Sequence, residues 1–304
     1  MQLWQDYHTP TTVDEALAAL ARYDGRARII SGGTDLLIDL QQADDAHEKP
    51  AALVDVTRIA EMTQIQLEGD VFTVGAAVTH AQIVKSAELE AAATCLVESC
   101  GVVGGPQVRN VGTLGGNVAH ALPAGDGTTS LVALDAEGLV AWADGRREWL
   151  PIRQLYKGPG ISLLDSRRDV LVAFRFAACG AGEGCAFKRI MRPQGVALPV
   201  LGCAVWVKLD GDSYADARVC ISPVAPTPIR ASEVEAALRG QPANEDTLNR
   251  AVQIAHETLH PRTSKYRATG EYRQGMIETL LRAALPKVTE RARTGAAVAE
   301  GVGM

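Results

Sequence analysis

The sequence predicts an α+β fold spread over two or three domains, and three observations carry this prediction. The chain has 304 residues, more than the roughly 100 to 200 of one ordinary domain. Helical spacing of apolar residues alternates along it with short alternating or fully apolar runs. Three glycines within residues 180–184 indicate a linker, and beyond it predicted strands come first and predicted helices last.

The N-terminal elements are each marked by a local signal. A capping-box pattern begins at Thr12 and again at Thr79, which predicts two helix starts, and Gly25 can end the first helix. The pair Gly69 and Asp70 lies between two alternating runs and indicates a hairpin. Strands are expected at 28–30, 53–56, 65–67 and 71–74, and helices after Thr12, after Thr79 and over 91–100.

Beyond residue 126 short strands dominate until the linker. Asp144 and Gly145 indicate a two-residue turn, and after the linker alternating runs predict three antiparallel strands. The alanine- and glycine-rich end, residues 287–304, is expected to be a disordered tail. Strands are expected at 131–134, 139–143, 146–149, 170–176, 187–190, 204–209 and 217–221, and helices over 232–239, 245–259 and 272–285.

Residues 104–117 form the most informative segment, because glycines are dense there and bulky apolar residues are few. Regular helix is not expected, since each glycine costs about 1 kcal/mol relative to alanine in a helix. Glycine lets the backbone approach a ligand closely, and free N–H groups in such a loop suit an anion. Thr113 adds a hydroxyl and Asn117 an amide, both able to bond phosphate or ring polar atoms.

Residues 29–37 form a second glycine loop, in which Gly32 and Gly33 follow a predicted strand. Thr34 or Asp35 can cap a helix that starts there. A strand, a glycine turn and a helix start together present N–H groups to a phosphate. The chain contains neither G-x-G-x-x-G nor G-x-x-x-x-G-K-[ST], so dinucleotide-binding Rossmann and P-loop sites lose their strongest support.

Composition argues against several classes of partner. A formal charge of −6 offers no electrostatic case for nucleic acid or for an anionic membrane surface. No apolar run approaches the roughly 20 residues that span a bilayer. The first residues lack the basic and apolar pattern of a signal peptide, so we expect a cytoplasmic protein.

Metal-binding patterns are weak, and we expect no metal on this chain. No two cysteines form a C-x-x-C pair, which favours small buried residues in a reducing compartment without an iron–sulfur cluster. Residues 256–260 match the zinc motif H-E-x-x-H. Pro261 disfavours helix at His260, which separates His260 from His256 and argues against zinc. The six cysteines are Cys95, Cys100, Cys179, Cys185, Cys203 and Cys220.

The two glycine loops together resemble the FAD-binding subunit of molybdenum hydroxylases, the xanthine dehydrogenase and carbon monoxide dehydrogenase family. That family shows "AGGTDLL" and then "RNVGTIGGNLANADPAAD", whose counterparts here are 31–37 and 109–126. The resemblance continues at 156–160 (family "F-x-G-P-G"), 170–172 ("E-I-I") and 187–189 ("Y-R-K"). Order and spacing agree over roughly residues 1 to 285.

The resemblance implies a two-subdomain FAD-binding fold of the vanillyl-alcohol-oxidase or PCMH type, followed by a C-terminal domain of antiparallel sheet plus helices. FAD would lie between subdomain 1, residues 1–57, and subdomain 2, residues 58–180. The C-terminal flavoprotein domain would cover residues 185–286.

The resemblance also implies which residues contact FAD. Backbone N–H groups of Gly32 and Gly33 would approach the pyrophosphate, and Ser31 stands where relatives usually have alanine. Thr34 and Asp35 could bond the flavin or cap a helix. The full implied set is Ile30, Ser31, Gly32, Gly33, Thr34, Asp35, Leu36, Val103, Thr113, Gly116, Asn117, His120, Asp126, Leu171 and Lys188.

Some of these assignments leave an alternative open. Lys188 would place a cation near the isoalloxazine, where it stabilises reduced flavin, or it is a solvated strand lysine. His120 would bond a phosphate or the flavin edge, or it is a structural histidine. Asp126 would lie near the ribityl or adenosine portion, Leu171 would pack near the flavin, and Val103 is either a flavin contact or a core residue.

The implied function is electron transfer. A large partner subunit would carry the molybdenum cofactor and a small one two [2Fe–2S] clusters, while this chain would pass electrons from FAD to NAD⁺ or another acceptor. No catalytic acid or base is expected here, because the flavin carries the redox chemistry. A self-contained flavin oxidoreductase and a flavin-free assembly or scaffold subunit remain as alternatives.

Overall fold

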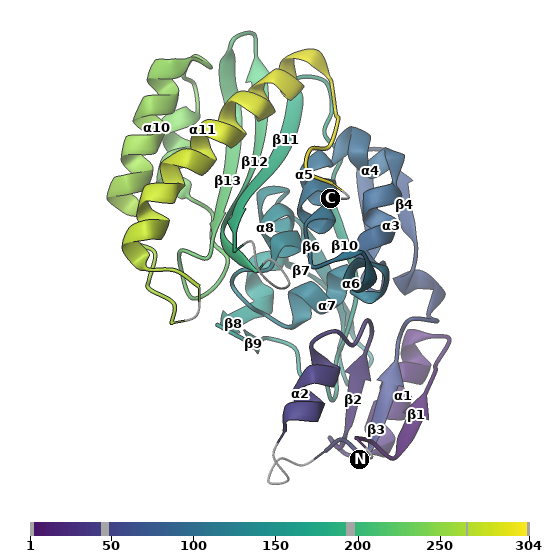
Figure 1. Cartoon of the computed structure of the whole chain (residues 1–304). Coiled ribbons are helices and arrows are strands. Elements are labelled where there is room, and N and C mark those ends of the chain that lie inside the picture. The colour runs from purple at the N-terminus through teal and green to yellow at the C-terminus, as the bar shows by residue number, and fades with distance from the viewer. Residues whose placement is uncertain (1–2, 44–48, 193–197, 266, 303–304) are drawn as a thin grey trace.

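A computed structural model describes residues 3–43, 49–192, 198–265 and 267–302. The chain combines helices and sheets in three sheet-containing regions that follow one another from the N-terminus (Figure 1). The N-terminal region stands apart at one end, the middle region carries most short helices, and the C-terminal region pairs a long sheet with long helices. The predicted α+β class is confirmed.

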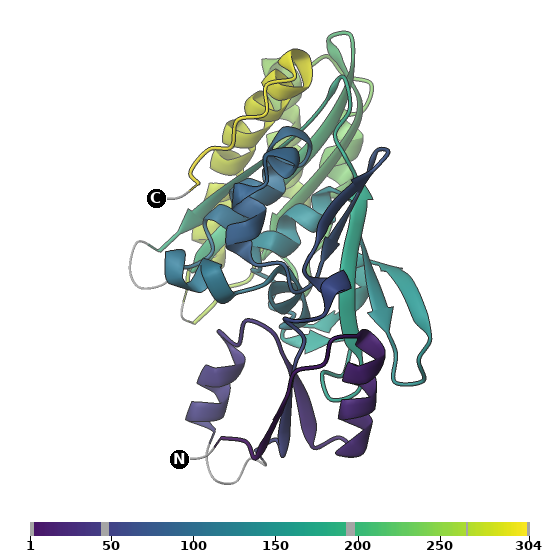
Figure 2. The ribbon, with the colours of Figure 1, turned by 90° about the vertical axis from the view of Figure 1, so that its right-hand side faces the viewer.

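A small parallel sheet forms the N-terminal region. Its strand order is β1-β3-β2, and α1 and α2 lie on opposite sides of it (Figure 2). The capping box predicted at Thr12 is confirmed, because its side chain accepts the Glu15 N–H at 3.1 Å. Asp35 precedes α2 without a side-chain cap bond. The bounds are β1 Asp6–His8, α1 Val13–Arg22, β2 Ala27–Ile30, α2 Leu36–Gln42 and β3 Ala52–Asp55.

A five-stranded antiparallel sheet, in the order β4-β5-β10-β6-β7, organises the middle region. The predicted hairpin is confirmed: β4 and β5 pair around Gly69, which has φ 62°. The strands are β4 Ile65–Glu68, β5 Val71–Gly75, β6 Glu137–Ala141, β7 Arg147–Pro151 and β10 Val170–Ala177, with a small pair β8 Tyr156–Gly158 and β9 Ile161–Ser162. The shorter helices are η1 Ala60–Met62, α3 His80–Lys85, α4 Ala87–Ala92, α5 Thr94–Gly101 and η2 Ile152–Leu155.

The prediction that residues 104–117 avoid regular helix is wrong, because α6 (Pro106–Val111) and α7 (Leu114–Ala119) form there. Pro106 opens α6, where its missing N–H costs nothing. The Thr113 hydroxyl caps α7 by accepting the Gly116 N–H at 3.1 Å. A Cβ on Gly115 would come within 2.5 Å of the Ala76 carbonyl oxygen. Close backbone contact therefore requires glycine inside a helix.

A second correction concerns residues 131–134, which were predicted as a strand. They belong to α8 (Asp126–Ala133) and its C-cap, and every residue of this helix is buried. A short apolar run fits a buried helix as well as a buried strand, so its periodicity cannot separate them. A hydrogen bond between the Thr128 and Tyr156 hydroxyls, at 2.9 Å, joins this helix to β8.

The C-terminal region is a three-stranded antiparallel sheet with long helices packed on one face, as predicted (Figure 1). Its core is apolar and includes Val205, Val219, Leu281 and Leu285. The elements are β11 Glu183–Met191, β12 Pro199–Asp210, β13 Ser213–Ser222, α9 Ser232–Leu238, α10 Glu245–Thr258 and α11 Gly270–Thr294. None of the helices within the described residues is both long and apolar enough to cross a membrane.

The predicted disordered tail at 287–304 is also wrong for the described residues. Helix α11 continues through Pro286 to Thr294, where Gly295 ends it with φ 69°. Beyond it the chain folds back: the Ala299 N–H donates to the Glu90 carboxylate at 2.9 Å, and Val302 packs over Gly101. Tertiary contacts order a segment whose composition alone resembles a flexible tail.

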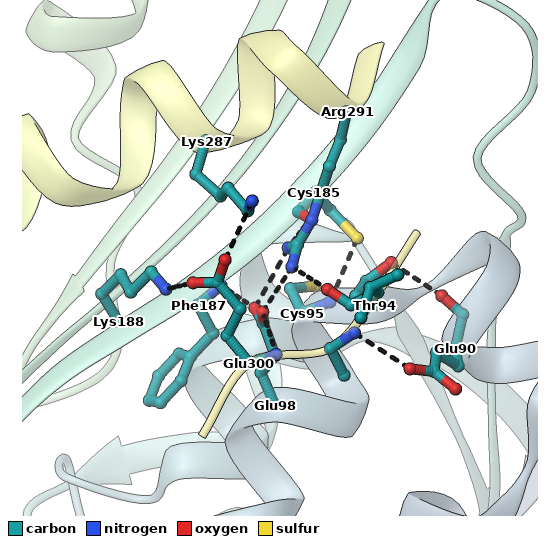
Figure 3. Close-up of polar contacts among 12 residues, drawn as sticks. Glu90, Thr94, Cys95, Glu98, Cys185, Phe187, Lys188, Lys287, Arg291 and Glu300 are labelled. Carbon is teal, nitrogen blue, oxygen red and sulfur yellow. Dashed lines mark hydrogen bonds and ion pairs between the residues drawn. The ribbon is translucent and has the colours of Figure 1, made fainter. Parts of the chain in front are cut away.

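Two buried ion pairs join the middle and C-terminal regions. Glu98 on α5 meets Arg291 on α11 at 2.6 Å, and its carboxylate also accepts the Phe187 N–H at 2.7 Å (Figure 3). Asp126 on α8 meets Arg189 on β11 at 2.7 Å. Unpaired charges are costly inside a protein, so this pairing makes the relative placement of the two regions specific.

Candidate functional site

A cavity of about 540 Å³ lies between the N-terminal and middle regions. Its size falls within the roughly 300 to 1,000 Å³ of small-molecule sites. It is lined by the two glycine loops, by the start of α3, and by residues 160–171 that lead into β10. The predicted site residues that line it are Ile30, Ser31, Gly32, Gly33, Thr34, Asp35, Leu36, Val103, Thr113, Gly116, Asn117, His120 and Leu171.

The two glycine loops touch one another at the cavity wall. A Cβ on Gly32 would lie 2.1 Å from the Val111 carbonyl oxygen and 2.8 Å from the Gly112 Cα. Gly33 has φ 69°, a conformation that residues with a side chain rarely adopt. The first loop therefore needs glycine at both positions, at Gly32 for the close approach of the second loop and at Gly33 for the backbone conformation.

The first loop offers backbone donors to the cavity. The first helical bond of α2 runs from the Leu37 N–H to the Gly33 carbonyl. Residues 32–35 precede it, and their N–H groups find no acceptor within the described part of the chain. In the second loop, the Gly115 and Gly116 N–H groups are already used by Ala76 and Thr113. The first loop therefore has unbonded N–H groups at the cavity, whereas these two N–H groups of the second loop are already bonded within the protein.

Two buried polar atoms in the cavity wall lack a partner within the described residues, the Ser31 Oγ and the His80 Nδ1. Buried polar groups are normally hydrogen-bonded, so both atoms indicate a ligand with polar atoms of its own. Burial, with the Arg109 charge beside it, lowers the pKa of His80 to about 4. His80 is therefore neutral near pH 7 and can donate or accept one hydrogen bond.

The rim of the cavity is polar. His120 Nε2 lies 3.8 Å from the Asp35 carboxylate, and both side chains are partly exposed. The Asn117 side-chain oxygen accepts the Thr128 N–H at 3.3 Å, which ties the second loop to α8. The bond to Thr128 positions the Asn117 side chain in the cavity wall.

Two predicted site residues, Asp126 and Lys188, do not line this cavity, and their contact with FAD stays a prediction. Asp126 is buried against Arg189; burial raises the pKa of Asp126 to about 7, although Arg189 lowers it. Lys188 instead pairs with Glu300 of the C-terminal segment (Figure 3). Both side chains therefore form ion pairs with residues of other segments, Asp126 with β11 and Lys188 with the C-terminal segment.

Sequence reasoning missed His80 and, apart from Leu171, the lining residues of the 160–171 segment, among them Gly160 and Asp165. The resemblance at 156–160 was visible in the sequence, but it carried no residue role. Gly160 has φ 71°, which turns this segment back toward the cavity. For His80 the only sequence signal was its place directly after the capping residue Thr79.

The H-E-x-x-H motif does not assemble. Helix α10 ends at Thr258, before His260, as Pro261 predicted. His256 lies 3.7 Å from Glu278 on α11 and receives a bond from the Gln274 amide. No group of three or more His, Cys, Asp or Glu side chains that could hold a metal occurs within the described residues.

Comparison with known proteins agrees with this architecture. The family profile "FAD binding domain in molybdopterin dehydrogenase" matches residues 2–176, and "CO dehydrogenase flavoprotein C-terminal domain" matches residues 185–288. The carbon monoxide dehydrogenase medium chain of Hydrogenophaga pseudoflava is 29% identical over 280 residues, covering 92% of this chain and 95% of that one. The xanthine dehydrogenase FAD-binding subunit of Escherichia coli O157:H7 is 31% identical over 277 residues, covering 90% and 92%.

A solved structure extends the likeness to three dimensions. Carbon monoxide dehydrogenase from Hydrogenophaga pseudoflava, in a form that lacks the Mo-pyranopterin moiety of the molybdenum cofactor, superimposes with a TM-score of 0.86 at 29% identity. The alignment covers 94% of this chain and 98% of the other. The chain belongs to the family of FAD-binding medium subunits of molybdenum hydroxylases, the class that includes carbon monoxide and xanthine dehydrogenases. It is an oxidoreductase flavoprotein subunit whose cofactor is FAD.

Proposed function

We propose that this chain carries electrons between subunits: from the [2Fe–2S] clusters of a small partner subunit onto its FAD, and from there to NAD⁺ or another acceptor. A large partner subunit with the molybdenum cofactor would oxidise the substrate. The observation that carries the proposal is the cavity, where two glycine loops, free N–H groups and two unpartnered polar atoms converge. Bound FAD supplies the redox chemistry.

We assign the FAD contacts to the residues that line the cavity. The N–H groups of Gly33 and Thr34 would bond pyrophosphate oxygens, which suits an anion in a backbone loop. Ser31 and neutral His80 would each complete their hydrogen bonding on a polar atom of the cofactor. Leu36 and Leu171 would add apolar contact and help exclude water.

The division of the chain at 1–57, 58–180 and 185–286 is part of the proposal. Each segment has its own main sheet, and the second segment also contains the small pair of β8 and β9. The ordered C-terminal helix extends the last segment to Thr294. A cytoplasmic location accords with six unpaired cysteines, since reducing compartments keep thiols free.

The test is the absorption spectrum of the purified chain, with the released cofactor identified by mass. We expect bound FAD at one per chain and no iron–sulfur absorption. Co-expression with candidate partner subunits would then give a complex in which substrate reduces the FAD. Failure to bind added FAD would overturn the redox role and favour a scaffold subunit.

A chain that binds FAD and oxidises a small substrate without partners would instead support a self-contained flavin oxidoreductase. Stopped-flow reduction separates these cases, because the proposed subunit receives electrons only when the iron–sulfur subunit is present. Candidate acceptors, NAD⁺ and a quinone, are compared by the rate at which each reoxidises the reduced complex.

A further inference from the structure

The chain returns to the middle region after the long helix α11. Residues 296–302, which we call the C-terminal strap, run back toward α5 (Figure 1). The Ala299 N–H donates to the Glu90 carboxylate of α4 at 2.9 Å. The Glu300 N–H donates to the Glu98 carboxylate of α5 at 3.0 Å. The family profile matched to the C-terminal domain ends at residue 288, so the strap lies beyond the part of the chain that the profile describes.

Charged side chains anchor the strap on its other side. Buried Arg291 of α11 donates from Nη2 to the Val298 carbonyl at 2.6 Å. The Glu300 carboxylate pairs with Lys287 of α11 at 2.9 Å and with Lys188 of β11 (Figure 3). The strap is therefore tied to α11 and β11 as well as to α4 and α5, so its position is fixed from several directions.

The end of the strap rests directly on the last residue of α5, which is Gly101. A Cβ on Gly101 would lie 2.5 Å from the Val302 Cγ1 and 3.2 Å from the Val302 Cα. Both the backbone and the side chain of Val302 thus occupy the space that any larger residue would need. Val302 also packs against the apolar core of the middle region.

The turn that follows α5 forms part of the cofactor cavity, because Val103 lines it. Two arginines bind carbonyl groups of this turn. Arg189 of β11 donates to the Val102 carbonyl at 2.5 Å, and Arg109 of α6 donates to the Gly104 carbonyl at 2.9 Å. These bonds hold the turn from one side, and the strap covers the helix end from which the turn begins.

We propose that the C-terminal strap is a positioning element for the cofactor site. By packing on Gly101 it fixes the turn at 102–104 and thereby keeps Val103 in the wall of the cavity. The inference rests on the proposed function, because it takes FAD as the occupant of that cavity. A site that is formed before its ligand arrives binds more tightly, since the ligand does not have to order it. Without the strap, FAD would have to order the turn on binding.

The test is titration of the apoprotein with FAD. Val302→Ser removes the apolar contact with Gly101 and should weaken FAD binding about tenfold, a change typical of coupled packed neighbours. A chain that ends at Gly295 should show at least the same loss. Val302→Ile retains an apolar side chain at the contact and should restore the wild-type affinity. Val298→Ala is the matched control, because that side chain is 70% exposed and its carbonyl is retained.

Hydrogen exchange of the apoproteins separates positioning of the turn from general stabilisation of the fold. In Val302→Ser, amide exchange should become faster in peptides that cover residues 101–105. Peptides from β12 and β13 should keep their wild-type rates, because their core lies in the C-terminal region.

Two results overturn the proposal. One is wild-type FAD affinity in Val302→Ser, and the other is weakened affinity without faster exchange at residues 101–105. The single substitutions decide the case whether or not the shortened chain folds. Failure of the wild-type chain to bind FAD is a different outcome, which would overturn the proposed function and this inference with it.

Discussion

Replacing Gly32 by alanine tests the contact between the two glycine loops, on which the cavity depends. The added Cβ would lie 2.1 Å from the Val111 carbonyl oxygen, whereas real Cβ contacts essentially never fall below 3.0 Å. The neighbouring atoms are backbone, so no side-chain rotation relieves the clash. The loops must therefore move apart by nearly one ångström, about two thirds of a carbon–carbon bond.

The cost of this movement has two parts. Overpacking of a well-packed site costs about 1–3 kcal/mol, so we expect the free energy of unfolding to fall by that amount. The displaced loop also carries the N–H groups that face the cavity, so FAD affinity should fall at least about tenfold, equivalent to about 1.4 kcal/mol. Calorimetric titration of the apoprotein with FAD and denaturant unfolding measure the two effects separately.

Gly275→Ala is the matched control. This glycine lies within α11, and an added Cβ there meets nothing within 4 Å. Alanine should stabilise the helix by about 1 kcal/mol and leave FAD affinity unchanged. Wild-type stability together with wild-type FAD affinity in Gly32→Ala would refute the close contact between the loops and the reasoning built on it.

Three further predictions concern buried polar groups. Glu98→Gln leaves the buried Arg291 without its counter-charge and should lower the free energy of unfolding by about 3–5 kcal/mol. Glu300→Gln removes a charge from an exposed ion pair and should lower it by less than about 1 kcal/mol. Equal effects of the two substitutions in urea unfolding would contradict this prediction. Folded His80 resists protonation until about pH 4 while the unfolded chain takes up the proton near pH 6.5, so its stabilising contribution is present above pH 6.5 and is lost as pH falls toward 4. Buried Asp126 makes stability change with pH in the opposite direction over an overlapping pH range. The measurement is therefore the difference in unfolding free energy between wild type and His80→Asn, which cancels the contribution of Asp126. This difference should shrink by about 3 kcal/mol between pH 7 and pH 4, and parallel pH profiles of the two proteins would count against the prediction. Ser31→Ala removes an unpartnered buried hydroxyl and should stabilise the apoprotein by about 1 kcal/mol while weakening FAD binding in titration, and a gain in affinity would exclude the assigned bond.

Much of the local structure could be predicted from the sequence because its causes are local. The capping boxes at Thr12 and Thr79, the hairpin at Gly69 and the three C-terminal strands all form as expected. In the capping boxes and the hairpin the atoms that stabilise the element lie within a few residues of one another, and the C-terminal strands are joined to their neighbours in sequence. The glycine loops belong to the same category, since their motifs and order identify the family.

Sequence motifs alone could not predict every residue that lines the cavity. His80 lines the cavity because α3 packs beside the second glycine loop, where the His80 N–H donates to the Gly112 carbonyl at 2.9 Å. Nothing near His80 in the chain signals that contact. The resemblance implies that Lys188 contacts the flavin, and the structure adds that Lys188 pairs with Glu300, which lies 112 positions further along the chain.

The sequence by itself determined the α+β class, the family and the two loops that shape the cofactor cavity, because each rests on short-range patterns of glycine, capping and apolar residues. Only the tertiary structure decided that residues 106–111 and 114–119 are helical, that α11 continues through Pro286, and that the C-terminal segment is ordered. In each of these places local preference points away from the observed conformation. Burial and contacts between distant segments, such as Gly115 against Ala76, outweigh a local cost of about 1–3 kcal/mol.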